Sequence, residues 1–469
     1  MLRPHSSNAF ALVVAFALIV GTSLLTVPRC VVAQTTSTQT AFVRATTATI
    51  SPSTVFGTTL RITLGEVLER AGADNLLIKE SEARYTLALA NEMRTGAWFM
   101  PSFYAGAGVY GASGTVMNAR GEFFQNVSPN NASIVGGIVG EWRFADAVYA
   151  TKAAAYRSEA AREDIAAQRN RTLFSAVGAY FDIAAAQERM RLLGETTTLN
   201  ERLLTQIELQ QGAGLSYKSD VLLVKSSLSR LRVLSQQAAA EVYRRSAELS
   251  AALNIEEPHL IIASDSAFFP IPLNDTLALE ALTKEALLLR PELRSFQNEV
   301  AALREEATAF STGRLLPSVT LNLSTTLLGS VPAPEFGRAA STLGITWSAP
   351  LADMLGRGQA QQVETLLGLR KAQTEVLANQ IEREVGAFIG ALAMLRPALE
   401  YAREGMSAAR EALEQSIGRQ KLGTAKPFEV LQAYDYVTRA QGDYVQIVSE
   451  YNKAEYGLFL ARGRTINKK

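Results

Sequence analysis

Long stretches of this chain repeat apolar residues with the spacing of an α-helix. Apolar residues from Leu64 to Ala71 recur at i, i+3, i+4 and i+7, which predicts helical structure from residue 64 to about 96. The segment 146–211 contains no proline and carries a similar pattern, which predicts one helix about 100 Å long. A helix of that length does not fit a compact domain, so it implies coiled-coil-like packing.

Two other stretches alternate apolar and small residues, and they predict β-hairpins over about 101–145 and 317–350. A polar stretch from Asn118 to Asn131 is the expected loop of the first hairpin. The other predicted helices cover 219–254, 277–310, 353–421 and 428–460, with a kink or an offset expected at Pro397.

The same order of elements occurs twice, at an offset of about 210 residues, which is far longer than the roughly 20–50 residues of a solenoid repeat. We therefore predict a duplication, with one repeat over 62–254 and a second over 276–463. A proline-containing connector (255–275) joins them, and a short tail (464–469) follows. The landmark pairs are Pro101 with Pro317, Asp146 with Asp353, Gly214 with Gly423, and Asp220 with Glu429.

The N-terminus has the features of a secretory signal. Arg3 precedes an apolar run over 9–25, and Val31-Val32-Ala33 forms a cleavage site, which predicts a signal peptide over 1–33. A retained membrane anchor is the alternative. Arg29 stands where a lipidation motif needs a small residue, so Cys30 is not expected to carry lipid. Residues 34–61 are rich in Thr and Ser and predict an extended segment.

The composition argues against several classes of protein. The formal charge is only +1, with 46 basic and 45 acidic residues, which argues against nucleic-acid binding. Two His and one Cys provide little material for a metal site, and we find no catalytic Ser/His/Asp set or phosphate-binding loop. The chain is therefore expected to be neither an enzyme nor a cofactor-binding protein. After the signal, no stretch has the roughly 18 consecutive apolar residues of a transmembrane helix.

Two hairpins supply only four strands. A two-stranded hairpin is not stable alone, and a membrane barrel needs at least about eight strands. The strands must therefore be completed by other chains, although the spacing does not set their number.

At this point the residues resemble the TolC-like outer-membrane efflux proteins, over about residues 62–463. Each motif is weak alone, but their order, the duplication and the signal sequence are together specific. The motifs are Leu316-Pro317-Ser318, Arg290-Pro291-Glu292-Leu293, Trp347-Ser348-Ala349-Pro350-Leu351 with Asp353 and Gly356-Arg357-Gly358, and the two turns of form Gly…(Asp/Glu)-Val-Leu.

This resemblance implies a homotrimer with a twelve-stranded barrel in the outer-membrane lipid and an α-helical tunnel in the periplasm. It also implies a periplasmic adaptor (membrane fusion) protein and an inner-membrane pump or ABC transporter, which drives passive export of small molecules or proteins. A periplasmic coiled-coil adaptor or scaffold without a pore is the alternative. Such an adaptor would show one helical hairpin flanked by β-rich segments, whereas this chain has two long-helix units that each follow a hairpin.

Two turns are candidate adaptor contacts at the periplasmic tip. Ordinary turn chemistry is an equally good explanation, because Gly supplies a positive φ and Ser or Thr caps the next helix. The candidate tip residues are Gly214, Leu215, Ser216, Leu422, Gly423 and Thr424.

Acidic residues after the second turn form constricting rings in the family. Position by position, Glu429 matches the first acidic site and Gln432 the second, which has lost its charge, while Asp220 is the counterpart in the first repeat. A charged ring favours cations. The alternative is a helix N-terminal carboxylate on a solvated face. Lys426 is close enough in sequence to pair with an acidic neighbour.

Aromatic residues gather near the hairpin ends. A membrane-interface belt is one interpretation, and packing between barrel and tunnel is the other. The candidates are Trp98, Phe99, Tyr104, Trp142, Phe144 and Trp347.

Overall fold

The computed structural model describes residues 58–73, 75–111, 114–118, 120–127, 130–255, 259–264, 268–273, 278–313, 316, 318–330, 338–348 and 358–464. All of them belong to one compact unit, Ser51–Lys469. The predicted signal peptide, residues 34–57, the loop of the second hairpin and residues 465–469 lie outside the described residues.

Each half contains a hairpin followed by a very long helix and a returning helix. The first half contains β1 (Thr58–Ile62), α3 (Leu64–Ala73), α4 (Leu76–Gly96), β2 (Ser102–Gly111), β3 (Gly114–Met117), β4 (Phe123–Val127), β5 (Asn130–Arg143), the π-helix η1 (Asp146–Ala150), α5 (Thr151–Gly212) and α6 (Lys218–Ala252). The second contains β6 (His259–Ala263), α7 (Leu279–Leu289), α8 (Pro291–Ser311), β7 (Ser318–Ser330), β8 (Arg338–Ser348), α10 (Gly358–Lys421) and α11 (Pro427–Ala461). The predicted class, long antiparallel helices with a β-hairpin in each half, is confirmed.

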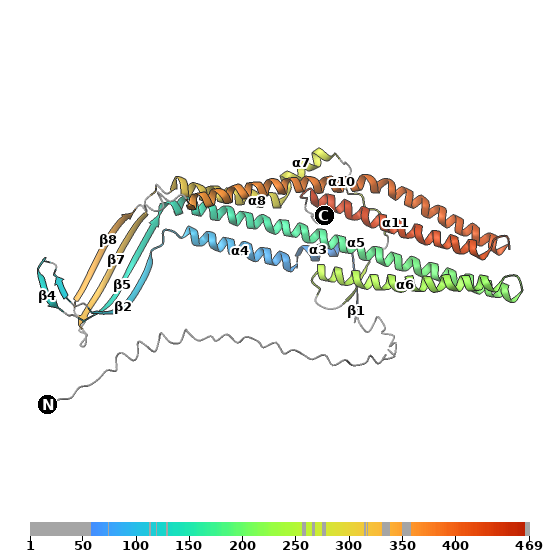
Figure 1. Ribbon diagram of the computed structural model, residues 1–469, viewed down its shortest axis with the longest axis horizontal. Coiled ribbons are helices and arrows are strands. Elements are labelled where there is room, and N and C mark those ends of the chain that lie inside the picture. The colour runs from blue at the N-terminus through green and yellow to red at the C-terminus, as the bar shows by residue number, and fades with distance from the viewer. Residues whose placement is uncertain are drawn as a thin grey trace, which may run out of the picture. The chain divides into compact units, whose positions relative to one another are not determined.

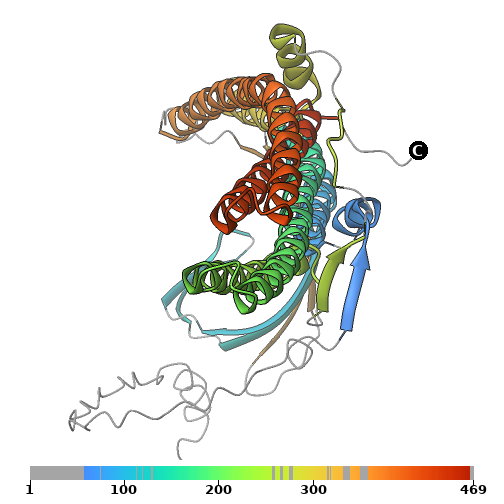
Figure 2. The same cartoon turned by 90° about the vertical axis from the view of Figure 1, so that its right-hand side faces the viewer.

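The long helices stand side by side within this unit. Helix α5 packs against α6 and α11, and α11 packs in turn against α10 (Figure 1). Viewed along their length, the helices form a curved layer, with α3, β1 and β6 on one side of it (Figure 2). Helix α10 continues without an offset through Pro397, contrary to one of the two expected outcomes.

One described helix, α10, passes a simple test for a transmembrane helix, although the sequence predicts none after the signal. By length and composition alone, α10 is the one described helix that could cross a membrane. That test is weak here, because the stretch contains Arg396, which forms an ion pair with the buried Glu455 of α11. We assign no membrane span to α10.

The four strands of the two hairpins form one antiparallel sheet in the order β2-β5-β7-β8. Strand β5 pairs with β7 over thirteen positions, from Asn131 opposite Ser330 to Arg143 opposite Ser318, so the hairpins of the two repeats are joined directly. Strands β2 and β8 are the two edges of this sheet (Figure 1).

Gly137 of β5 allows the closest approach in this sheet. A Cβ at that position would lie 2.5 Å from the backbone oxygen of Leu323 and 2.9 Å from the Cα of Ser324. Such contacts are essentially forbidden, so only glycine fits there without movement of the neighbouring strand.

Four details of the structure differ from the prediction or add to it. The stretch from Asn118 to Asn131 is not one loop, because it contains β4, which pairs with β3 in a further small hairpin. Residues 58–61 and part of the connector are strands, since β1 pairs in parallel with β6. The helix predicted over 277–310 divides at Arg290, which is extended (φ −66°, ψ 122°) because Pro291 disfavours a helical residue before it. The helix predicted from residue 146 begins as the π-helix η1.

The apolar core forms along the helices rather than at one centre. One cluster joins α3, α5, α6 and the β1–β6 pair around Val177, Leu249 and Ile261. A second joins α7, α8, α10 and α11 around Leu392 and Leu458. A third lies near the two helical turns and contains Ile207, which is fully buried. The first cluster also contains Leu460 of α11, and the third combines residues of α5 and α6 with residues of α10 and α11, so these two clusters hold the repeats together.

Candidate functional site

The two turns at the far end of the long helices have the same geometry. Gly214 has φ +75° and Gly423 has φ +72°, a conformation that L side chains rarely adopt. The N–H of Leu215 donates to the carbonyl of Gln210 (2.8 Å), and the N–H of Thr424 donates to that of Arg419 (2.9 Å). Both are the i-to-i−5 bonds of a glycine-terminated helix, so the predicted turn chemistry of Gly214 and Gly423 is present in both repeats.

Apolar side chains project from both turns. Leu215 and Leu422 are each 80% exposed. Tyr217 and Phe428, which the sequence-based prediction did not include, are also exposed beside them. The available signal was an aromatic residue within five positions after each turn glycine, at the start of the next helix. The tips therefore present an exposed apolar surface, defined here as Leu215, Tyr217, Leu422 and Phe428.

The candidate gate carboxylates bond within their own turns. Asp220 accepts from the hydroxyl of Ser216 (3.1 Å) and the N–H of Tyr217 (3.2 Å). Glu429 accepts from the N–H of Lys426 (3.3 Å). These are helix N-terminal caps, as the alternative interpretation requires.

Glu429 has a cationic partner that the sequence did not indicate. Nη1 of Arg419, at the end of α10, lies 3.4 Å from the carboxylate of Glu429. The cationic partner of Glu429 is thus Arg419, whereas the sequence indicated Lys426. The exposed Gln432 donates to the hydroxyl of Tyr436 (3.4 Å). Glu429, Gln432 and Tyr436 recur at i, i+3 and i+7, so they share one face of α11.

A buried amide cluster ties the two repeats together just above the tips. Nε2 of Gln206 donates to Oε1 of Gln420 (2.8 Å), and Nε2 of Gln420 donates to Oε1 of Gln210 (3.1 Å). Gln420 is only 3% exposed. Because Gln206 and Gln210 are one helical turn apart on α5, Gln420 of α10 bridges two successive turns.

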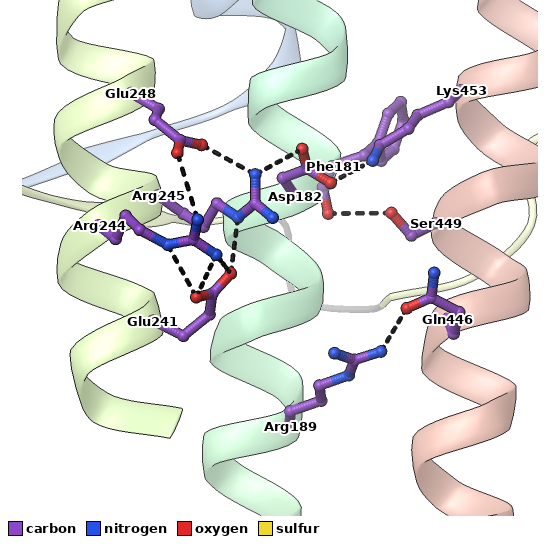
Figure 3. A network of polar contacts seen from close by, with 10 residues as sticks. All are labelled: Phe181, Asp182, Arg189, Glu241, Arg244, Arg245, Glu248, Gln446, Ser449 and Lys453. Atoms are coloured by element: carbon purple, nitrogen blue, oxygen red, sulfur yellow. Dashed lines mark hydrogen bonds and ion pairs between the residues drawn. The ribbon is translucent and has the colours of Figure 1, made fainter. Parts of the chain in front are cut away.

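A second tie, higher in the bundle, is made of charges. Asp182 of α5 bonds to Nη1 of Arg245 on α6 (3.2 Å) and to Nζ of Lys453 on α11, so one carboxylate joins three helices (Figure 3). Arg245 also donates to Glu241 (2.7 Å) and Glu248 (2.8 Å) of its own helix.

This charged tie is expected to weaken in acid. Hydrogen bonds from Arg244, and then from Arg245, hold the pKa of Glu241 below its ordinary value of 4.5 against the opposing effect of burial. A carboxyl with a lowered folded-state pKa stabilises the fold above its unfolded pKa, and that stabilisation is lost as the pH falls through the folded pKa. We expect a loss of at most about 1 kcal/mol, because the side chains are partly exposed.

Thermal unfolding between pH 6 and pH 3 measures this effect. The variant Glu241→Gln lacks the titrating group, so its melting temperature should fall less steeply over that range. An equal slope in both proteins would contradict the assignment.

Most of the candidate aromatic residues meet at the base of the sheet. The rings of Trp98 and Phe144 form an edge contact with centroids 6.2 Å apart. Nε1 of Trp142 donates to the carbonyl of Phe99 (3.0 Å). Val319 lies between Trp142 and Trp347 in the strand register, so the two tryptophans stand at the same level of the sheet.

Tyr104 lies apart from this group, farther along β2, where its hydroxyl donates to Oδ1 of Asn322 (3.4 Å). The structure thus brings together five of the six candidates, by contact or by register, and separates Tyr104 from them.

The two faces of the four-stranded sheet differ in chemistry. The strand register aligns four apolar residues in one row across the sheet, and all four are exposed: Phe103, Ile138, Leu323 and Leu343. The neighbouring row on the opposite face contains Tyr104, Gly137, Ser324 and Thr342. One face is therefore apolar and exposed, and the other carries mainly small and polar residues.

Known proteins resemble this chain in sequence and in fold. No family model matches it. The outer membrane efflux protein BepC of Brucella suis is 24% identical over 308 residues, a match that spans 65% of this chain and 66% of that protein.

Two solved structures share the fold. The outer membrane protein VceC of Vibrio cholerae superposes with a TM-score of 0.70 at 17% identity, covering 85% of this chain and 96% of that one. The open state of the MtrE outer membrane channel of Neisseria gonorrhoeae gives a TM-score of 0.67 at 17% identity, covering 88% and 93%.

The long antiparallel helices and the four-stranded amphipathic sheet give this chain the same architecture as these outer-membrane proteins. The comparisons confirm the resemblance predicted from the sequence: the chain has the fold of the TolC-like outer-membrane channels. They also support the predicted location in the outer membrane with an extension into the periplasm.

Proposed function

We propose that the chain forms the outer-membrane channel of a tripartite efflux or type I secretion system. Export through it is passive, and an inner-membrane pump or ABC transporter supplies the energy. The observation that carries this proposal is the amphipathic sheet, whose exposed apolar row would be costly in water and is favourable in lipid. Its relatives of known name are efflux proteins and channels.

Three copies of the sheet are proposed to close into one barrel. The edge strands β2 and β8 present unpaired backbone groups, which are not tolerated in a bilayer. Pairing β2 of one copy with β8 of the next satisfies both edges, and a homotrimer gives a barrel of about twelve strands. The apolar row with Phe103 and Leu343 then faces lipid, and the row with Ser324 and Thr342 faces the pore.

The exposed tip surface is the proposed contact for a periplasmic adaptor. Its apolar residues flank two glycine turns of the same geometry, and such an exposed apolar surface suits contact with the end of another helical hairpin. Leu215 and Tyr217 come from one repeat and Leu422 and Phe428 from the other, so a trimer would present six such tips of two kinds.

Membrane fractionation and planar-bilayer conductance of the purified full-length protein test the proposal. The expected result is a membrane-bound trimer that gives stepwise conductance. A soluble monomer without conductance would instead support a periplasmic adaptor or scaffold.

Ion selectivity tests the proposed gate at Glu429. A unit charge acts on a monovalent ion about 10 Å away with about 0.4 kcal/mol in water, which is about a twofold change in local ion concentration. We expect Glu429→Gln to lower the cation preference by about that factor or less, because Arg419 already offsets part of the charge. The glutamine retains an oxygen that can accept from the N–H of Lys426, so the turn should persist.

The reciprocal variant Gln432→Glu is the matched control. It adds a carboxylate on the same face of α11 and is expected to raise the cation preference. If neither variant changes the reversal potential in a salt gradient, Glu429 does not line the constriction.

A further inference from the structure

A small, partly open cavity lies where α5, α6 and α11 meet, between the tip and the charged tie of Figure 3. Its volume is about 40 Å³. The wall combines apolar residues with hydroxyl, amide and charged side chains, and three of its members are nine-tenths or more buried: Thr196, Asn200 and Tyr434.

Asn200 is a buried polar residue of this wall whose side-chain oxygen has no hydrogen-bond donor. It is 0% exposed, and its Oδ1 is among the described buried side-chain oxygens that have no hydrogen-bond partner. Its Nδ2 donates to the carbonyl of Thr196 (3.4 Å). Exchanging the two amide atoms would place oxygen against oxygen at Thr196, so the orientation is fixed by chemistry. Burial of such an oxygen costs free energy unless a donor reaches it.

Other oxygens of the wall have acceptor capacity to spare. The hydroxyls of Thr196 and Thr438 each donate to a carbonyl of their own helix, at 3.0 Å and 2.8 Å. A hydroxyl oxygen that donates once retains two lone pairs. The cavity therefore combines an unsatisfied acceptor with further acceptors, and it requires a ligand that donates twice.

The charges around the cavity and its volume further restrict which ligand it can hold. Arg230 is one of the residues that line the cavity, and the carboxylate of Asp435 is already paired with Arg439, so a cation is disfavoured. Burial raises the pKa of the Tyr434 phenol to about 12, so the phenol adds no negative charge near neutral pH. By this measure of volume, one water requires roughly 10–15 Å³.

We infer that this cavity is a water-binding site, in which an ordered water donates one hydrogen bond to Oδ1 of Asn200 and the other to the hydroxyl of Thr438. The water would join α5 of the first repeat to α11 of the second at a point where direct side-chain bonding falls short. The inference concerns the bundle alone and does not depend on the proposed channel function.

The structure of the full-length protein, solved at a resolution that shows solvent, tests the site directly. The expected result is a peak about 2.5–3.0 Å from Oδ1 of Asn200. Xenon pressurisation is the counter-test, because dry apolar cavities bind xenon and hydrated polar ones do not. An empty cavity, or one that fills with xenon, would overturn the inference.

The variant Asn200→Leu distinguishes the two cases by the sign of its effect. If water is bound, leucine removes its partner, and the melting temperature should fall by about 2 °C or more. If the cavity is dry, leucine replaces an unsatisfied amide with an apolar side chain of similar volume, and the melting temperature should stay the same or rise. Thr198→Leu, at an exposed position on the same helix, is the control and should change the melting temperature little. The solvent peak in the unmodified protein decides the question even if the Asn200 variant fails to fold.

Discussion

Replacing Glu455 by alanine is expected to lower the free energy of unfolding by about 1.5–3 kcal/mol, the usual loss when hydrogen bonds to a charged group are removed. The loss stays below that for a fully buried ion pair because the Arg396 side chain is 37% exposed and can be hydrated. Glu455 of α11 is 0% exposed. It accepts from Nη2 of Arg396 on α10 (3.2 Å) and from the N–H of Leu273 in the connector (3.2 Å). The alanine variant therefore loosens α10 and the connector from α11 at once.

Denaturant unfolding of the purified protein measures this loss. Glu455→Gln retains the size and one acceptor for Leu273, so an intermediate loss is expected. Glu450→Ala, an exposed site on the same helix, is the matched control. If the two alanine variants lose the same stability, the burial of Glu455 does not carry the effect.

Replacing Gly137 by alanine is expected to reduce assembly of the proposed barrel about tenfold. The new Cβ would meet the backbone of β7 at 2.5 Å and 2.9 Å, so the strand pairing between the two repeats must shift. Overpacking of this kind costs about 1–3 kcal/mol, and here the obstacle is backbone rather than a flexible side chain. The helices should form normally, because the change lies outside them.

The adjacent glycine provides the control. A Cβ at Gly136 would have its closest contact at 3.9 Å, from the backbone oxygen of Tyr104. Gly136→Ala should therefore assemble almost normally, as judged by the fraction of trimer in detergent and by conductance. Equal assembly of the two variants would show that the strands accommodate the extra methyl group at residue 137.

The long helices could be predicted because their signal is local and repeated. The predicted span 146–211 corresponds to η1 and α5, and 353–421 corresponds to α10 within the described residues. Pro397 illustrates the limit of such reasoning. A proline removes one backbone donor and favours a kink, yet the turns on both sides still pack against α11, so the helix continues.

The β1–β6 pair could not be predicted because it joins segments about 200 residues apart, and parallel pairing leaves no turn signal. Residues 259–263 form a short apolar run, and periodicity alone does not distinguish a strand from a loop at that length. The small hairpin β3–β4 was missed for a related reason. Its polar surroundings indicated a loop, although Phe123 and Phe124 mark a strand within it.

The sequence predicted the two turns of the candidate site, but it did not predict which side chains form ion pairs or become buried there. A glycine at the end of a predicted helix indicates a positive φ, and Gly214 and Gly423 both have one. The partner of Glu429 could not be foreseen, because Arg419 reaches it only through the geometry of the second turn. Asn200 likewise looks like any helical asparagine until three helices bury it. The gate, tip and interface roles of the other candidates stay predictions.

The glutamine cluster above the tips has one more consequence. Gln206, Gln210 and Gln420 hold the repeats together with neutral amides, which neither titrate nor attract counterions. The tie around Asp182 and Arg245 is built from charges, which salt screens, and the lowered pKa of Glu241 beside it adds a response to acid. A more acidic or more saline fluid would therefore weaken the charged tie by about 1 kcal/mol or less and leave the amide cluster unchanged, so these two links between the repeats respond differently to the same environment.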